Sequence, residues 1–181
     1  NTVGGVFFGN SSSLAPDIDE VYMYSANDFI SKLQFSDNTW PMSVMSHAYI
    51  SSQTISSSQS EGLTSTLDGN TQYSNVLHIV GANNGASATL PQIWSHSYNS
   101  ITVGRTDGQH SAGVIQDGYI GAGRQKPEIV NPQGKTSYST GATASVAALL
   151  RALADAHSSP DAIKALTIKS CILAGADKLK F

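Results

Sequence analysis

Short apolar runs, separated by longer segments in which apolar residues have a helical spacing, limit the folds open to this chain more than any other feature. Each run is short enough for one buried strand, and Gly, Asn or Pro residues lie near most of their ends. The candidate strands are residues 20–24, 43–50, 76–80, 101–104 and 129–130. Segments with helical spacing lie between them. Strands that alternate with helices predict a layered α/β domain with a mainly parallel sheet.

The candidate helices differ in how clearly they are marked. Residues 28–35 carry apolar side chains at 29, 30 and 33, and residues 62–73 form a weaker helical pattern. The apolar segment 3–8 fits a strand or a helix. A last helix is expected from Pro160 through residue 173, with Ser159 as its cap. We find no internal repeat and no linker, so residues 1–181 are interpreted as a single domain.

Composition excludes several classes of partner. Charged residues make up 13% of the chain and the net charge is −3, against a typical charged share of about 25%. No basic stripe is present for nucleic acid or for an anionic membrane, and no apolar run approaches the ~18 residues of a membrane span. The surface must therefore consist largely of Ser, Thr, Asn and Gln, which is common in secreted proteins. We expect a secreted or cell-envelope location.

The single cysteine offers neither a disulfide nor a metal cluster. Cys171 lies between Ile168 and Ile172 in the last predicted helix, so we expect a buried and inert thiol. Three acidic residues, Asp17, Asp19 and Glu20, are interpreted as a solvated turn because their spacing is not that of a calcium loop. No metal site is predicted.

Two polar stretches next to apolar elements are candidates for function. The run Thr136-Ser137-Tyr138-Ser139-Thr140 leads directly into a strongly apolar helical segment at 144–150. Its hydroxyls could cap the helix, or Ser137 could be a nucleophile at the positive end of the helix dipole. Asn83 lies in "GANNG", directly after the predicted strand 76–80. By itself this segment indicates a turn.

Five segments, in order, resemble the subtilisin-like serine peptidases. "KTSYSTGATASVAALL", residues 135–150, is similar to the Gly-Thr-Ser-x-Ala-x-Pro segment that carries the family's nucleophile. "GRQKPEIVNPQG" (123–134) resembles the stretch before it, and "HIVGANNG" (78–85) the strand that ends in Ala-Gly-Asn-x-Gly. Pro91 with "SITVGRTD" (100–107) resembles the next turn and strand. "TVGGVFFGNSSSLAP" (2–16) resembles the segment that follows the catalytic His.

The resemblance implies a three-layer α/β sandwich with a mainly parallel sheet, lacking its N-terminal part, and hydrolysis of peptide bonds. Ser137 would be the nucleophile, and Asn83 with the Ser137 N–H would hold the oxyanion. Residues 43–50 would correspond to the strand to which an extended peptide substrate adds. The implied substrate-binding residues are Ala48, Tyr49, Gly81 and Ala82.

The His and Asp of the triad have no counterpart in this sequence. The family order is Asp, His, Ser, and the resemblance begins just after the His, so both would come from an upstream segment or a separate chain. The five histidines present, at 47, 78, 96, 110 and 157, match no catalytic His of the family. We therefore expect residues 1–181 alone to be almost inactive. The chemistry implied needs no cofactor, although the family often binds structural calcium.

The chain departs from the family pattern at three places, and two of them, Lys135 and Tyr49-Ile50, support a second interpretation. Lys135 replaces the Gly before Thr-Ser, Gly141 replaces the Pro after the nucleophile, and Tyr49-Ile50 stand where the substrate strand usually has glycines. The alternative to an endopeptidase is thus an inactive scaffold of the same fold, which binds an extended peptide or a protein partner.

Overall fold

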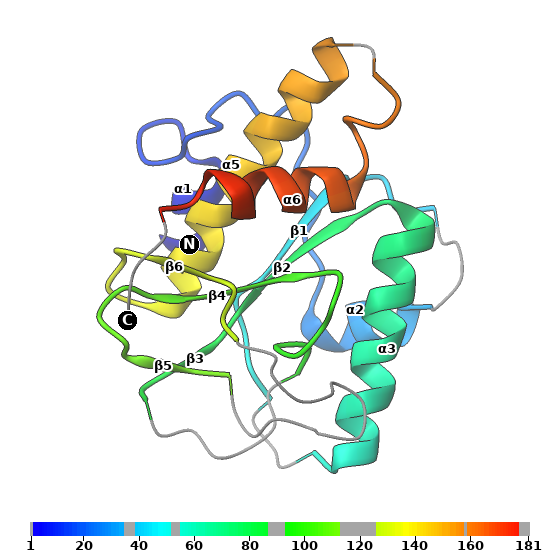
Figure 1. Cartoon of the computed structure of the whole chain (residues 1–181), viewed down its shortest axis with the longest axis vertical. Helices are drawn as coiled ribbons and strands as arrows, with labels where there is room; N and C mark the ends of the chain where they lie inside the picture. Colours follow the sequence, from blue (N-terminus) through cyan, green and yellow to red (C-terminus); the bar gives the residue numbers. More distant parts are fainter. Residues whose placement is uncertain are drawn as a thin grey trace.

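A parallel sheet forms the centre of the structure (Figure 1). The computed structural model describes residues 2–34, 39–51, 55–86, 93–112, 126–157 and 159–177. Four strands pair in the order β1-β2-β4-β6, and every pairing is parallel. They are β1 (Val44–His47), β2 (Leu77–Gly81), β4 (Ile101–Arg105) and β6 (Ile129–Asn131). A short antiparallel pair, β3 (Asn83–Asn84) and β5 (His110–Ser111), stands apart from this sheet.

Helices cover both faces of the sheet. They are α1 (Thr2–Phe8), α2 (Ala26–Lys32), α3 (Ser57–Ser74), α5 (Thr136–Ala156) and α6 (Ala165–Gly175). Figure 1 shows α1, α5 and α6 on one side of the sheet and α2 and α3 on the other. The predicted α/β class with a mainly parallel sheet is confirmed. The helical layers are expected from parallel strands, because each crossover connection returns over a face of the sheet.

Alternation along β2 divides the core into two clusters. Leu77 and Ile79 face α5 and α6, where they pack against Ala147 and Ile168. Val80 faces the opposite way, toward α2 and α3. This period of two is the geometry of a strand buried on both faces. It explains why β2 appears in the sequence as an almost continuous apolar run.

The start of the chain is attached to α5 through backbone and hydroxyl contacts. A Cβ atom on Gly141 would lie 3.1 Å from the carbonyl oxygen of Val3, so glycine lets α1 approach α5 closely. The Ser145 hydroxyl accepts hydrogen bonds from the N–H groups of Leu14 (2.8 Å) and Ala15 (2.9 Å). These contacts fix the point from which the chain leaves α1 toward residues 17–24.

Three local expectations differ from the structure. Residues 20–24 form no strand and pair with no described strand. The last helix begins at Ala165, because residues 160–163 form turns instead. Cys171 is exposed, since the buried stripe of α6 runs through Ala165, Ile168 and Ile172 and leaves the thiol outside it. Pro91, residues 123–125 and the expected helix end at residue 35 lie outside the described residues.

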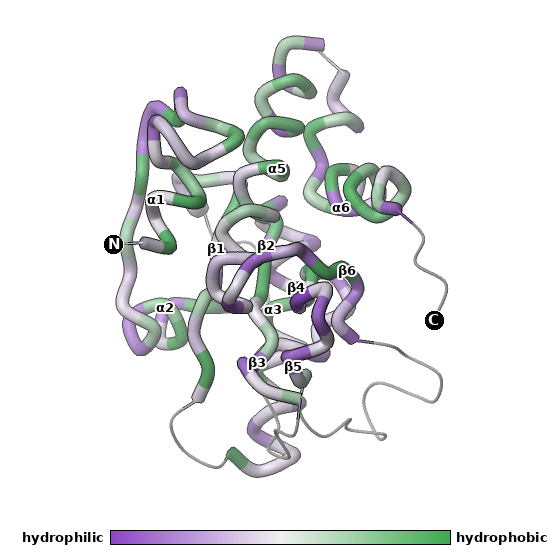
Figure 2. Tube along the Cα trace, turned by 90° about the vertical axis from the view of Figure 1, so that its left-hand side faces the viewer, coloured by the Kyte–Doolittle hydropathy of each residue, from purple (hydrophilic) through white to green (hydrophobic). Residues whose placement is uncertain are grey.

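None of the helices in the described part of the chain is long and apolar enough to cross a membrane. The hydropathy of the residues differs between parts of the fold. Figure 2 shows α6 largely hydrophobic, whereas the β3 and β5 region beyond the sheet is hydrophilic.

Candidate active site

The first turn of α5 begins beside the carboxyl ends of the parallel strands, where ligands gather in open α/β sheets. Lys135 is the N-cap residue, with extended backbone and no side-chain capping bond. Ser137 is the second residue of the helix and is half-buried. The predicted position of Ser137 on the first turn of a helix is thereby confirmed.

A side chain from another element binds the first N–H of this helix. The Thr136 N–H donates to Oδ1 of Asn84 over 3.0 Å. The Thr140 hydroxyl donates to the Thr136 carbonyl (2.8 Å), and the Ser139 hydroxyl to the Asn131 carbonyl (3.4 Å). None of these hydroxyls therefore caps the helix, and that interpretation of the hydroxyl run is wrong for them. Asn84, 52 residues before Thr136, binds the open helix end and ties β3 to it.

Close packing brings the end of β2 against the same turn. A Cβ atom on Gly81 would lie only 2.7 Å from Oγ1 of Thr140. Ala82 is buried, and its N–H donates to the Val103 carbonyl over 3.0 Å. Gly81 and Ala82 thus form a rigid link between the sheet and the turn that carries Asn83.

Open hydrogen-bonding groups remain at this junction. Within the described ranges, the N–H and the hydroxyl of Ser137 make no hydrogen bond, and neither does the side-chain amide of Asn83. Both residues are half-buried. An unengaged N–H at the amino end of a 21-residue helix favours an anion, because the helix dipole is positive there. The arrangement suits stabilisation of a developing negative charge.

Within the described residues, no hydrogen bond joins Ser137 to a histidine. His110 lies in β5, and its Nδ1 accepts from the Arg105 N–H over 3.0 Å, so a neutral ring carries its proton on Nε2. Burial lowers the pKa of His110. His157 follows the far end of α5, roughly 30 Å from the first turn at 1.5 Å per residue. His96 is buried, and no hydrogen bond joins it to Ser137.

The remaining two histidines form a buried chain on the opposite face of the sheet. His47 Nε2 lies 2.9 Å from His78 Nδ1, and His78 Nε2 lies 3.1 Å from Asn70 Oδ1. The Asn70 amide nitrogen donates to Gln34 and Ser74, which fixes its oxygen as the acceptor.

The direction of every proton in that chain follows. His78 donates from Nε2 to Asn70, so its Nδ1 must accept from the Nε2–H of His47. His47 Nδ1 is then an acceptor, and the Tyr49 hydroxyl, 3.2 Å away, donates to it. Burial lowers the pKa of His47 to about 3, and burial and then the charge of His47 lower the pKa of His78 well below 6.5. Both rings are neutral, and all four of their nitrogens take part in hydrogen bonds. Neither ring therefore has a free nitrogen that could act as a base.

The expected substrate strand is only partly open. Ala48 and Tyr49 directly follow β1 and are half-buried. The Tyr49 ring packs edge-on against His47 and Trp94, and burial raises the pKa of its hydroxyl. Tyr49 is therefore a structural part of the buried chain. Ile50, the next residue, is exposed.

Among the residues that the structure describes, no three His, Cys, Asp or Glu side chains gather into a group that could hold a metal ion. Comparisons with models of protein families, with curated proteins and with solved structures find no match for this chain.

Two features of the site were not predicted. Asn84 could be identified only as a turn residue, because its partner is far away in sequence. One weak feature of the sequence pointed to the His47–His78 chain. Both histidines lie in segments that their apolar neighbours already identified as buried strands. Their pairing depends on the β1–β2 register, which aligns Met45 with His78.

Proposed function

We propose that this chain is the Ser-bearing part of a subtilisin-like serine endopeptidase. Ser137 is the nucleophile, and the Asn83 side chain and the Ser137 N–H hold the oxyanion. The general base His and its orienting Asp belong to polypeptide outside residues 1–181. The substrate is an extended peptide that lies near Ala48, Tyr49, Gly81 and Ala82.

One observation carries the proposal: the bond from the Thr136 N–H to Asn84 Oδ1. It ties together the residues that adjoin Ser137 and Asn83 along the chain. The resemblance to the peptidase family had paired these same two short segments, although they are more than fifty residues apart. The unengaged Ser137 N–H and Asn83 amide add two donors at this junction, as an oxyanion site requires.

The chemistry assigned to these residues is acyl transfer. The Ser137 Oγ attacks the scissile carbonyl carbon while the external His takes the hydroxyl proton. The carbonyl oxygen gains the negative charge, which the Ser137 N–H and the Asn83 amide stabilise. The C–N bond then breaks, and the His returns the proton to the leaving amine. Water repeats the sequence on the acyl-enzyme and restores the serine.

A fluorophosphonate probe tests the assignment, because it reacts only with an activated serine. Residues 1–181 alone should label weakly, since an unassisted hydroxyl is a poor nucleophile. A longer form of the protein that contains the His and Asp should label at Ser137, and Ser137→Ala should remove the signal. Ser139→Ala, two residues along the same helix, is the matched control and should retain it.

Two outcomes would contradict the proposal. Strong labelling of residues 1–181 that disappears with a histidine substitution such as His110→Gln would show that the base lies within the chain. A longer form that binds peptide but never labels would favour the inactive scaffold instead. The Lys135 N-cap, which stands where the family has Gly, is the feature that favours this second function.

A further inference from the structure

Lys135 is the N-cap residue of α5, two residues before Ser137, and this position is unfavourable for a lysine. An ammonium group cannot accept a hydrogen bond from the N–H groups of the first turn, and the side chain forms no capping bond. It also adds a positive charge at the end of the helix that is already positive. Residues that break a local rule of this kind are expected at functional sites.

The charge of Lys135 has no counter-ion within the described structure. Five other basic side chains each form an ion pair with a carboxylate, namely Arg105, Lys126, Arg151, Lys164 and Lys169. Lys135 is exposed and forms no ion pair with any described residue. Its positive charge is therefore open to an anionic ligand.

Lys164 provides a comparison within the same chain, because it is the N-cap residue of α6 and has no capping bond either. Its Nζ lies 2.7 Å from Oδ1 of Asp161, so a neighbouring carboxylate neutralises it. No carboxylate of the described residues does this for Lys135. Both helices thus begin after a lysine, but α5, whose first turn carries Ser137, leaves the charge open.

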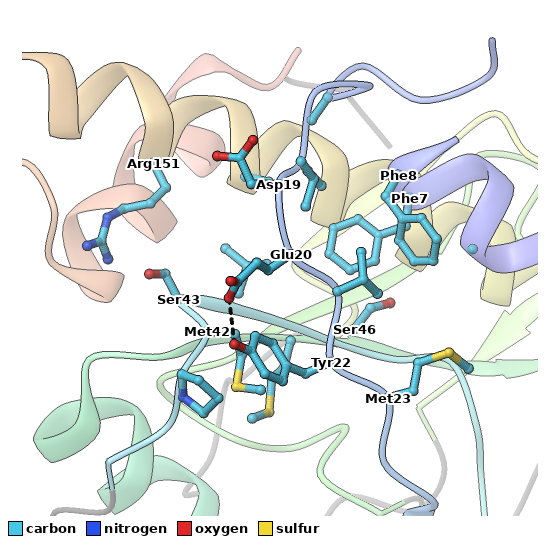
Figure 3. A pocket seen from close by; sticks show the side chains of 18 of the residues that line it. Phe7, Phe8, Asp19, Glu20, Tyr22, Met23, Met42, Ser43, Ser46 and Arg151 are labelled. Carbon is cyan, nitrogen blue, oxygen red and sulfur yellow. Dashed lines mark hydrogen bonds between the residues drawn. The ribbon is translucent and has the colours of Figure 1, made fainter. Parts of the chain in front are cut away.

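Acidic side chains near the start of the chain lie elsewhere. Asp19 and Glu20 line a groove of about 690 Å³ beside β1, and neither Lys135 nor Ser137 belongs to its lining. Figure 3 shows both carboxylates in this groove, where the Tyr22 hydroxyl donates to Glu20. These carboxylates therefore do not neutralise the charge beside the candidate active site.

Tyr138 holds the ammonium group of Lys135 over the first turn of α5. The Lys135 Nζ lies 5.9 Å from the centre of the Tyr138 ring, within the range of a cation–π contact. The Cα atoms of Lys135 and Ser137 can be no more than about 7 Å apart, because only one residue lies between them. The charge is thus within reach of a peptide bound at Ser137.

Strand order indicates which part of a bound peptide would meet Lys135. Lys135 follows β6, whereas the expected substrate residues Tyr49 and Ala82 follow β1 and β2. In the order β1-β2-β4-β6, β6 lies at the opposite end of the sheet from β1. Asn83, which would hold the carbonyl oxygen, directly follows Ala82, so the acyl part of the peptide lies toward β1 and β2. The leaving-group part then lies toward β6 and Lys135.

We propose that Lys135 selects substrates with an acidic residue, Asp or Glu, at the first or second position of the leaving-group part. An extended peptide advances about 3.3 Å per residue, so carboxylates at both positions lie within reach of a lysine side chain. The ammonium group acts as a point charge and attracts a carboxylate without requiring one fixed geometry. This inference rests on the proposed function, and it adds the class of peptide that the site prefers.

Cleavage of a random peptide library by the longer form of the protein tests the inference, because mass spectrometry of the products identifies the cleaved bonds. Asp and Glu should occur about 3- to 10-fold more often than Asn and Gln at one of the two positions, relative to their frequency in the library. This is the effect of one exposed ion pair near a helix N-terminus. In about 1 M salt the enrichment should fall below about 2-fold, since the Debye length is then about 3 Å.

Variants separate a role in specificity from a role in structure. Lys135→Gln should abolish the enrichment, and Lys135→Glu should replace it with an enrichment of Lys and Arg. For a peptide with Asp at the selected position, Lys135→Gln should raise KM about 3- to 10-fold and leave kcat nearly unchanged, because the ion pair forms in the ground state as well as in the transition state. Lys164→Gln, at the start of α6, is the matched control and should keep the original enrichment.

Fluorophosphonate labelling of Ser137 in the same samples separates this inference from the proposed function. Labelling and cleavage without a preference for Asp and Glu would overturn the inference alone, and so would a preference that Lys135→Gln retains. Removal of single residues from the carboxyl ends of the peptides would also overturn it, because it would assign the terminal carboxylate to Lys135. A longer form that neither labels nor cleaves would overturn both proposals.

Discussion

Mild acid should destabilise this protein through the buried pair His47 and His78. The two rings are 4% and 0% exposed, and their four nitrogens are engaged in one directed chain of hydrogen bonds. A proton added to either ring would have to sit on a nitrogen that already accepts a bond. Folding therefore requires both rings to be neutral, whereas the unfolded chain takes up protons near its ordinary histidine pKa of about 6.5.

The size of the effect follows from that difference. Burial lowers the pKa of His47 to about 3 and that of His78 well below 6.5. A lowered folded-state pKa means that the contribution to stability is complete above about pH 6.5 and is lost progressively as the pH falls below it. At about 1.4 kcal/mol per pH unit, His47 loses about 2 kcal/mol by pH 5, and His78 adds a loss of the same sign. The total loss is therefore about 2 kcal/mol or more, a large share of a typical domain's stability of about 5–15 kcal/mol.

Urea unfolding at pH 7.5 and pH 5.0 measures this loss, with Trp40 and Trp94 as fluorescent reporters. For an m-value of about 2 kcal/mol/M, the midpoint should fall by about 1 M or more between the two conditions. His47→Gln can still donate to His78 and accept from Tyr49, so it should remove the part of the pH dependence that is due to His47. Met45→Leu, on the same face of β1, changes packing without a titrating group and should keep the full dependence.

A free energy of unfolding that changes by less than about 0.5 kcal/mol between pH 7.5 and 5.0 would refute the reasoning, because two buried neutral rings require a much larger change. So would a pH dependence that His47→Gln leaves intact. His110, which is only partly buried and has a lowered pKa, adds a smaller contribution of the same sign. This smaller part would persist in His47→Gln.

Further predictions concern the first turn of α5. In a form of the protein that contains the external His and Asp, Ser137→Ala should abolish peptide hydrolysis and leave binding nearly unchanged in a peptide-binding assay. Asn83→Ala should lower kcat by about 10²–10³ with little change in KM, because the amide acts in the transition state. Asn84→Ala should cost about 0.5–2 kcal/mol in urea unfolding, the effect of losing a cap. Gly81→Ala should cost about 1–3 kcal/mol by overpacking, and Thr140→Ala should rescue part of that loss in a double-mutant cycle.

Prediction from sequence worked best where a local pattern is enough to define an element. The runs at 76–80 and 101–104 coincide closely with β2 and β4, because a strand buried on both faces needs a continuous apolar run. Residues 20–24 have the same β-like composition, yet they pair with nothing in the described structure. Strand pairing depends on a partner elsewhere, and composition contains no information about that partner.

In the candidate site too, local features could be predicted from the sequence, whereas contacts between distant residues could not. The sequence placed Ser137 at the entrance of a helix and Asn83 after a strand, since capping and turn chemistry are local. It did not show that Asn84 would bind the first N–H of α5, or that Cys171 would be exposed.

The sequence by itself therefore determined the buried strands and most of the helices, because these follow from the spacing of side chains along one chain. Only the tertiary structure decided which polar groups are engaged and which remain open. The Thr136 N–H is bound by Asn84 from 52 residues away, while the Ser137 N–H beside it makes no bond with a described residue. That difference arises from the packing of β3 against α5, and it leaves open the donor on which the proposed chemistry depends.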